Sequence, residues 1–363
     1  MQHITNSKEQ QRQRTAGNGT MQSKVLLIYT GGTIGMKRNP ATQALEPFDF
    51  EQLLYNVAEL KQFDTIIDTY QFKPPIDSSN MSPEKWTELS HCIADNYSDY
   101  DGFVVLHGTD TMAYTASALS FMLENLTKPV VFTGSQLPIG QLRTDGKENL
   151  ITSIEIAAAK DERGLAMVPE VGIYFGGHLL RGNRTTKQSA EEFNAFESFN
   201  YPHLAEAGVN ICYHRNRILT PDMNMPMTPH FQLDDNVVIF SLFPGIREEM
   251  INHIIEAPDL KAIVMRTFGS GNAPQRQWLL NALEEGTRRG KVIVNISQCM
   301  QGAVEMSRYD CGYHLQKAGV ISGRDSTVEA AVTKLMYLQA LYPDNPDKVR
   351  QMMSMSIRGE MTM

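Results

Sequence analysis

The sequence predicts an α/β protein with two domains: a larger N-terminal domain in which helices flank a mostly parallel sheet, and a smaller C-terminal α/β domain. Three observations predict this fold. The 363 residues exceed the size, roughly 250 to 300 residues, at which single hydrophobic cores stop growing. Short apolar, β-branched segments alternate with helical patterns, which is typical of parallel sheets. Near residue 220 both periodicities fail, which indicates a domain boundary.

Seven short segments are predicted to be buried strands. Each is predominantly apolar and rich in β-branched residues, and each is followed directly by Gly, Thr or Ser. Nearly continuous apolar segments of this length fit strands that are covered on both faces. The segments are residues 25–29, 103–107, 130–133, 171–175, 237–240, 262–266 and 292–296.

Helices are predicted between several of these strands. The first begins at Ser82-Pro83, because serine is a favoured N-cap and proline is tolerated at the first helical position. Apolar residues then recur at helical spacing, so that one face of each helix packs on the sheet. These residues are Trp86, Leu89 and Ile93 in the first helix, Met112, Ala116, Leu119 and Leu123 in the second, and Leu150, Ile154 and Ala158 in the third.

The domain limits follow from composition. Residues 214–235 are predicted to be a linker, because Asn and Pro crowd there and favour an extended backbone. The predicted domains are therefore residues 24–213 and 236–363. Residues 1–23 are polar and lack the apolar segment of a secretory signal, so we expect a flexible N-terminal tail.

Charge and cysteine content argue against several partners. The formal net charge is −8 and no basic run is present, whereas a nucleic-acid groove needs clustered cations. The longest apolar runs are far shorter than the roughly 20 residues that span a bilayer. Four cysteines without a C-x-x-C pair predict no disulfide framework. We therefore expect a cytoplasmic protein that binds neither nucleic acid nor membrane.

The residues that follow the predicted strands are rich in glycine, threonine and charge. Open α/β sheets bind ligands at the carboxyl ends of their strands, so function is expected there. Glycine lets backbone N–H groups approach a ligand, while hydroxyls, a carboxylate and a lysine are the parts of a nucleophilic site. The stretches concerned are residues 30–35, 107–111, 133–136 and 181–187.

A nucleotide site is one alternative for a glycine-rich turn, and the spacing disfavours it. Residues 30–35 do not read G-x-G-x-x-G, and Gly269-Ser270-Gly271 is followed by Pro274 where the third glycine belongs. The common zinc-hydrolase and serine-hydrolase motifs are missing as well. We expect neither a metal nor an organic cofactor.

Taken together, these stretches resemble the bacterial cytoplasmic (type I) L-asparaginases. The similarity runs in order from about residue 24 to residue 360. T-G-G-T-I alone is suggestive, and its combination with H-G-T-D-T and R-G-N-R-T-T-K is highly specific. The matching stretches begin at Tyr29, Asp77, Tyr100, Thr133, Arg181, Gly271, Gln298 and Arg358.

The resemblance implies L-asparagine amidohydrolase activity, with Thr33 as the nucleophile and Thr109, Asp110 and Lys187 as a second triad. A lysine kept partly neutral by burial would withdraw a proton through Thr109, while Asp110 holds the geometry. Taken singly, each residue also fits a structural role. Thr109 and Asp110 suit a helix N-cap, and Lys187 suits a solvated surface position.

The resemblance also implies a binding site for the amino-acid substrate. Asp110 would accept its ammonium group and Ser78 would bind its carboxylate, with Asp77 and Ser79 beside it. Asn272 would reach the ammonium group from a neighbouring subunit. Members of this family are typically dimers of intimate dimers, which implies a homo-oligomer.

One departure from the family concerns the loop after Thr33. Relatives often carry a catalytic tyrosine there, whereas residues 36–47 contain none, and Leu45 falls near its place. Tyr309 resembles the tyrosine of relatives that also lack the loop residue. The resemblance further implies a second, activating asparagine site. Its residues would be Arg266, Thr186 and Cys299.

Two alternatives to an asparaginase remain open at this point. One is a broader glutaminase or amidase with the same chemistry. The other is a non-catalytic amino-acid-binding regulatory module, which the loop without a tyrosine favours. Turnover of asparagine and glutamine separates both from the leading prediction.

Overall fold

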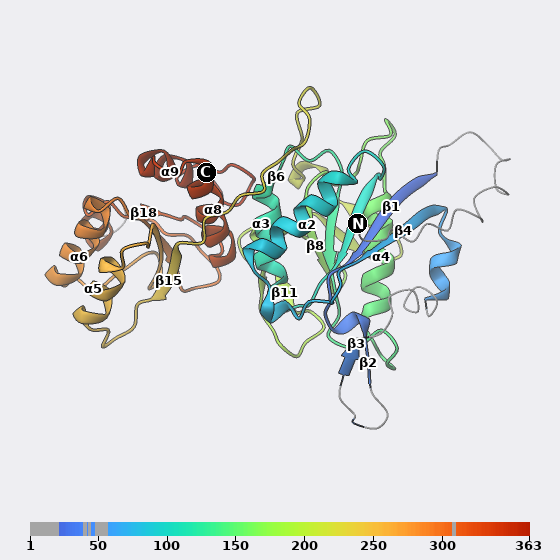
Figure 1. Cartoon of the computed structure of the whole chain (residues 1–363), viewed down its shortest axis with the longest axis horizontal. Coiled ribbons are helices and arrows are strands. Elements are labelled where there is room, and N and C mark those ends of the chain that lie inside the picture. The colour runs from blue at the N-terminus through green and yellow to red at the C-terminus, as the bar shows by residue number, and fades with distance from the viewer. Residues whose placement is uncertain (1–21, 39–41, 43–44, 48–56, 307–309) are drawn as a thin grey trace.

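The computed structural model describes residues 22–38, 42, 45–47, 57–306 and 310–363. These residues form two α/β domains that lie side by side (Figure 1). The larger domain contains an eight-stranded sheet and the smaller one a four-stranded sheet. This arrangement confirms the predicted fold class.

The larger sheet is parallel through its centre and antiparallel at one edge. Its parallel neighbours are, in order, β4 (Thr65–Gln71), β1 (Ser23–Tyr29), β5 (Gly102–Leu106), β7 (Val130–Thr133) and β8 (Val171–Phe175). The antiparallel strands are β9 (His178–Arg181), β12 (Ala205–Ala207) and β13 (Ile211–Tyr213). Tyr29 lies between Gln71 and Leu106, so β1, β4 and β5 end side by side. The loops after these three strands therefore meet at one edge.

All seven predicted strands are present, with ends within two residues of the prediction. The sequence patterns miss β4, β9, β12 and β13 of the larger sheet and β18 (Ile321–Ser322) of the smaller one. The position of β4 explains why it was missed. β4 is an edge strand in which Asp68 is the buried residue, so it lacks the apolar run of the inner strands.

Helices cover both faces of the larger sheet. α2 (Pro83–Asp95) and α3 (Met112–Met122) contribute to one apolar cluster, and α4 (Gly146–Ala158) contributes to the cluster on the opposite face. All three predicted helices are thereby confirmed. One detail differs: the hydroxyl of Ser82 donates to Glu84 Oε2 at 2.6 Å and accepts no backbone N–H of α2.

The smaller sheet is parallel throughout. Its strands are, in order, β15 (Val237–Ser241), β16 (Ala262–Thr267), β17 (Val292–Ser297) and β18 (Ile321–Ser322). One apolar cluster joins it to α5 (Glu248–Glu256), α6 (Gln277–Arg288) and α7 (Asp310–Lys317). A second cluster joins it to α8 (Val328–Leu341) and α9 (Pro346–Met353).

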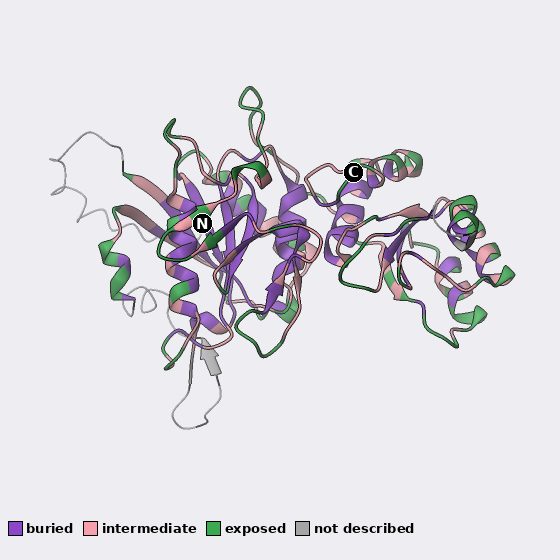
Figure 2. Cartoon of the chain, turned by 180° about the vertical axis from the view of Figure 1, so that it is seen from behind, coloured by how far each residue is buried: buried purple, intermediate pink, exposed green. Residues whose placement is uncertain are grey.

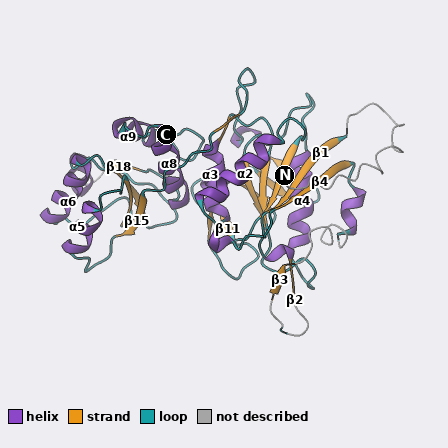
Figure 3. Ribbon diagram, viewed as in Figure 1, coloured by secondary structure: helices purple, strands orange, loops and turns teal. Residues whose placement is uncertain are grey.

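The two domains meet where α3 packs on α8. Phe121 of α3 and Tyr337 of α8 belong to one buried cluster, and their rings stack with centroids 6.1 Å apart. Figure 2 shows that buried residues gather in the sheets and in the helices facing them. The segment that joins the domains is mostly loop (Figure 3), and within it β14 (Thr228–Pro229) pairs with β6 (Leu123–Glu124). We propose that the domains divide at residues 214–235.

Two further predictions concern the chain ends and the membrane. Of the predicted tail, residues 1–21 lie outside the described residues, and β1 begins at Ser23. No helix within the described residues is long and apolar enough to cross a membrane.

Candidate active site

Three loops make backbone contact at the carboxyl ends of β1, β4 and β5. A Cβ atom on Gly31 would lie 2.0 Å from the carbonyl oxygen of Ile76, and one on Gly32 would lie 2.5 Å from the amide nitrogen of Gly108. A Cβ atom on Gly108 would lie 2.5 Å from Ser78 Oγ. Gly31 and Gly32 also have positive φ angles of 146° and 92°. Only glycine fits these positions, and this explains the glycines of the sequence motifs.

These contacts bring the predicted nucleophile close to the predicted triad. Thr33 directly follows Gly32, and Thr109 directly follows Gly108, so the two threonines flank one backbone contact. Thr33 opens a 3-10 turn, Thr33–Gly35, and is half-buried. Tyr29 lies beneath this turn, because a Cβ atom on Gly35 would lie 2.3 Å from its hydroxyl oxygen. Burial raises the pKa of Tyr29 to about 12, so this phenol stays protonated.

Lys187 joins Thr109 and Asp110. Its Nζ donates to Thr109 Oγ1 at 2.8 Å and to Asp110 Oδ1 at 2.7 Å. The lysine side chain is 18% exposed and the aspartate 64% exposed. Lys187 reaches this position from β10 (Thr186–Lys187), which pairs with β11 (Phe196–Glu197). The structure thus places one amine between a hydroxyl and a carboxylate whose other side is open to a ligand.

The segment Asp77-Ser78-Ser79 lies at the same edge. Asp77 Oδ1 accepts hydrogen bonds from the Ser79 amide at 3.0 Å and from its hydroxyl at 2.9 Å, which is an Asx turn. Ser78 is buried, and its carbonyl accepts from Thr111 Oγ1 at 2.7 Å. The turn therefore fixes Ser78 against the loop that carries Thr109.

His107 supports this loop from inside the domain. Its Nδ1 donates to the Gly108 carbonyl at 2.7 Å, and its Nε2 lies 3.0 Å from Thr115 Oγ1, which also accepts from Trp86 Nε1. Burial lowers the pKa of His107 to about 4, so the ring is neutral at pH 7. This position agrees with a structural role.

Two of the three predicted effector residues meet around a carboxylate that the sequence did not single out. Thr186 Oγ1 donates to Glu329 Oε1 at 2.7 Å, and Glu329 is 6% exposed. Burial raises the pKa of Glu329, while the hydrogen bond from Thr186 and the charge of Arg266 act in the opposite direction. In the sequence Glu329 reads only as an acidic residue in the first turn of a helix capped by Thr327.

The remaining predicted residues are Cys299, Asn272 and Tyr309. Cys299 is exposed, and its amide donates to Ser297 Oγ after β17. Asn272 forms a bridge with Phe268 after β16, so it belongs to the smaller domain and not to the cluster at the ends of β1, β4 and β5. Tyr309 lies outside the described residues.

A two-domain α/β fold that gathers hydroxyls, a carboxylate and a lysine at its strand ends has the parts that a nucleophilic enzyme needs. Residues 24–219 match the family model for the N-terminal asparaginase domain, and residues 236–353 match the glutaminase/asparaginase C-terminal domain. The chain therefore belongs to the asparaginase family of enzymes, as the sequence predicts.

Relatives of known structure or name agree with this assignment. L-asparaginase 1 of Escherichia coli (strain K12) is 43% identical over 352 residues, covering 94% of this chain and 99% of that protein. The crystal structure of L-asparaginase I from Vibrio cholerae superposes with a TM-score of 0.85 at 40% identity, covering 94% of this chain and 100% of that one. The 60 kDa lysophospholipase of Mus musculus is 38% identical, covering 94% of this chain and 63% of that protein.

Proposed function

We propose that the protein is a cytoplasmic L-asparagine amidohydrolase that converts L-asparagine and water to L-aspartate and ammonia. The observation that carries the proposal is the pair of bonds from Lys187 to Thr109 and Asp110, beside the turn that presents Thr33. The relatives named L-asparaginase support the choice of substrate, because they match the chain over nearly its whole length.

In the proposed mechanism Thr33 Oγ1 attacks the side-chain amide carbon of asparagine. Its proton passes to the amide nitrogen, ammonia leaves, and an acyl-threonine ester remains. Thr109 and Lys187 relay protons for the attack on the amide or for the water that cleaves the ester. Backbone N–H groups near Thr33 and Thr109 stabilise the developing oxyanion. No step requires a metal or an organic cofactor.

The charged groups of the substrate determine its orientation in the proposed site. We propose that Asp110 accepts the ammonium group, because its carboxylate is bound to Lys187 on one side and is 64% exposed. Ser78 binds the carboxylate, with Asp77 and Ser79 beside it. Asn272 would complete the ammonium site from a neighbouring subunit, so that a homo-oligomer, a dimer of intimate dimers, is the active form.

We also propose that asparagine activates the enzyme at a second site formed by Arg266, Thr186 and Cys299. The cluster around Glu329 supports this site, because Thr186 directly precedes Lys187 in β10. Thr186 and Lys187 are joined by one peptide unit, so a change in the conformation of Thr186 also affects the lysine of the proton relay. We assign to Tyr309 the catalytic role that relatives often give to a tyrosine in the loop after the nucleophile.

The test is steady-state ammonia release from the purified protein over a wide range of asparagine, with glutamine in parallel. We expect sigmoidal turnover of asparagine, little turnover of glutamine, and a hyperbolic curve for Arg266→Ala. A lysophospholipid is tested separately for release of its fatty acid, because one relative is named a lysophospholipase. If the folded protein releases ammonia from neither asparagine nor glutamine, the proposal is wrong and the binding-module alternative takes its place.

A further inference from the structure

The backbone that carries Lys187 has little secondary structure of its own. β10 has two residues and pairs with β11, which also has two, so this pairing supplies few backbone bonds. The residues before β10 form the 3-10 turn η5 (Gly182–Arg184). The placement of Lys187 Nζ between Thr109 and Asp110 therefore depends on the contacts that hold this turn.

Arg184, the last residue of the turn, is buried against the smaller domain. Its side chain is 2% exposed. Its Nε donates to the Gly359 carbonyl at 2.8 Å, its Nη1 to Asp325 Oδ2 at 2.8 Å and its Nη2 to Thr362 Oγ1 at 3.1 Å. These acceptors lie in the loop before α8 and in the segment that follows α9. Because all three guanidinium nitrogens are bonded, both the position and the orientation of the Arg184 side chain are fixed.

Two of these acceptors are also bonded to each other. Asp325 Oδ1 accepts from the Thr362 amide at 2.8 Å, and its Oδ2 accepts from the Thr362 hydroxyl at 2.6 Å. Burial acts to raise the pKa of Asp325, but the bonds from Thr362 and the charge of Arg184 outweigh it, so the pKa is lowered. The carboxylate is therefore ionised at pH 7. Arg184, Asp325 and Thr362, named here the Arg184 cluster, form a closed ring of hydrogen bonds.

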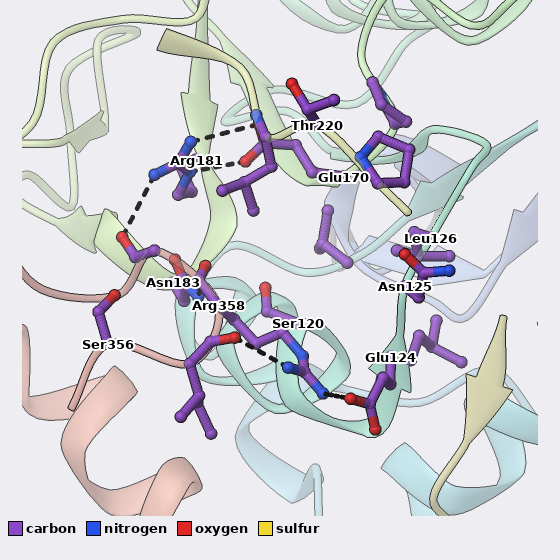
Figure 4. A pocket seen from close by; sticks show the side chains of 17 residues that line it. Ser120, Glu124, Asn125, Leu126, Glu170, Arg181, Asn183, Thr220, Ser356 and Arg358 are labelled. Carbon is purple, nitrogen blue, oxygen red and sulfur yellow. Dashed lines mark hydrogen bonds and ion pairs between the residues drawn. The ribbon is translucent and has the colours of Figure 1, made fainter. Parts of the chain in front are cut away.

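Other side chains near the turn bind the same segment. Asn183 Nδ2 donates to the Arg358 carbonyl at 2.9 Å, and Figure 4 shows these two residues next to each other. Arg181 Nη1 donates to the Gly359 carbonyl at 3.3 Å. Arg181 Nε is bonded to Glu170 Oε2 at 2.6 Å, and both of these side chains are 4% exposed. The segment after α9 thus contacts the turn at several points.

The larger domain also contacts the turn, through α3. A Cβ atom on Gly182 would lie 3.1 Å from that of Ala116, and the Gly182 carbonyl accepts from Ser117 Oγ at 3.4 Å. This bond is long for a hydroxyl donor and carries no charge. The bonds of the Arg184 cluster are shorter, and those to an ionised group are about twice as strong as neutral ones. We therefore expect the smaller domain to determine where the end of the turn lies.

We propose that Arg184 is a positioning residue for Lys187 and that Asp325 and Thr362 of the smaller domain hold it in place. Three residues of chain, at most about 10 Å, join Arg184 to Lys187, so a shift of the first displaces the second. The inference rests on the proposed function, in which Lys187 relays protons through Thr109. A displacement of about 1 Å is enough to slow such a step.

The first test is Asp325→Asn in the full-length protein, studied by crystallography and by ammonia release at saturating asparagine. Asparagine keeps the size of the side chain, but its oxygen can bind the Thr362 amide only if its NH2 group faces Arg184, donor against donor. We expect Lys187 Nζ to lie more than about 3.5 Å from Thr109 Oγ1. We also expect kcat to fall about tenfold.

The solvent deuterium isotope effect on kcat separates positioning from stability. It should be larger in Asp325→Asn than in the wild type, because a displaced amine makes proton transfer the slower step. A lower amount of folded enzyme would leave it unchanged. Asp234→Asn is the matched control, since Asp234 is 15% exposed and pairs with Lys261 at 2.6 Å, while Asp325 is 11% exposed. This control should change neither the isotope effect nor the Lys187 geometry.

A second pair of variants removes a single hydroxyl at an exposed position, where folding is not at risk. Thr362→Val deletes the group that bonds both Arg184 and Asp325, and should lower kcat about threefold with the same rise in the isotope effect. Thr362→Ser keeps the hydroxyl and should behave as the wild type.

The structures and the kinetics decide separate questions. An unchanged distance from Lys187 Nζ to Thr109 Oγ1 in both Asp325→Asn and Thr362→Val would overturn the positioning role, whatever the turnover. Equal falls in kcat for Asp325→Asn and Asp234→Asn, with unchanged isotope effects, would also overturn it and leave a stabilising contact. A displaced lysine with unchanged kcat would support the positioning role and contradict the proposed part of Lys187 in ammonia release.

Discussion

The strand-end site and the junction between the domains are built in different ways. At the strand ends, glycines bring short loops into backbone contact, and Lys187 is bonded to Thr109 and Asp110. At the junction, side chains from distant segments meet in buried surroundings. Several polar atoms there have no hydrogen-bond partner among the described residues, including Glu329 Oε2, Arg266 Nε and Asn183 Oδ1. The geometry of the strand ends is thus fixed by backbone contacts, while the junction buries polar atoms that have no partner among the described residues.

The largest effect is expected from Gly32→Ala, which disrupts the backbone contact between Gly32 and Gly108. The new Cβ would lie 2.5 Å from the Gly108 amide nitrogen, at a φ of 92°, so the loops must separate. We expect kcat to fall by about a hundredfold or more and the free energy of unfolding to fall by about 3 kcal/mol or more. Ammonia release and urea unfolding measure the two quantities.

Gly164→Ala is the matched control for this change. Gly164 also has a positive φ, 78°, but nothing lies within 4 Å of its Cβ position. We expect a loss of about 1 kcal/mol from the backbone angle and no change in kcat. Equal effects of the two substitutions on activity would show that the contact between the loops does not position the site.

The second-largest effect is expected from Lys334→Met, which tests the buried junction between the domains. Lys334 of α8 and Glu360 form an ion pair at 2.6 Å in which both side chains are 1% exposed. Removal of the lysine leaves a buried carboxylate without its cation, which we expect to cost about 3 to 5 kcal/mol in urea unfolding. The exposed pair of Lys85 and Glu88 gives the control, since Lys85→Met should cost about 1 kcal/mol or less. Similar costs for both lysines would contradict the picture of a tightly buried junction.

The smallest effect concerns the pH dependence of stability, tested by Glu329→Gln. Burial raises the pKa of Glu329, so the native state holds this proton more tightly than the unfolded chain does. The stabilisation is therefore complete below the unfolded pKa and is lost as the pH rises through the folded pKa. Glutamine keeps an acceptor for Thr186 but does not titrate.

Urea unfolding at about pH 5 and about pH 8 measures this difference. The fall in stability between the two pH values should be smaller in Glu329→Gln than in the wild type. An identical fall in both proteins would mean that Glu329 does not titrate in this range in the folded state.

The contrast between the two regions also explains what the sequence could predict. The inner strands and the three helices of the larger domain follow from local patterns. The meeting of Thr109, Asp110 and Lys187 is implied by the resemblance of the strand-end motifs to a known family, and not by those patterns. Edge strand β4 was not predicted because its buried residue is Asp68 and its other residues are only partly buried, so it lacks the apolar run of the inner strands. The sequence did not predict the roles of Glu329 and of the Glu170–Arg181 pair, because the segments that bury these residues are far apart in the chain.

The most direct measurement of the central claim is kcat for ammonia release from asparagine by Thr33→Ala, with Thr33→Ser beside it. Alanine removes the attacking oxygen while the Gly32–Gly108 contact is kept, so kcat should fall by about a thousandfold or more, with far-UV circular dichroism unchanged. Serine keeps a hydroxyl and should retain measurable turnover. An unchanged kcat in Thr33→Ala would contradict the account, because the nucleophile would then lie elsewhere.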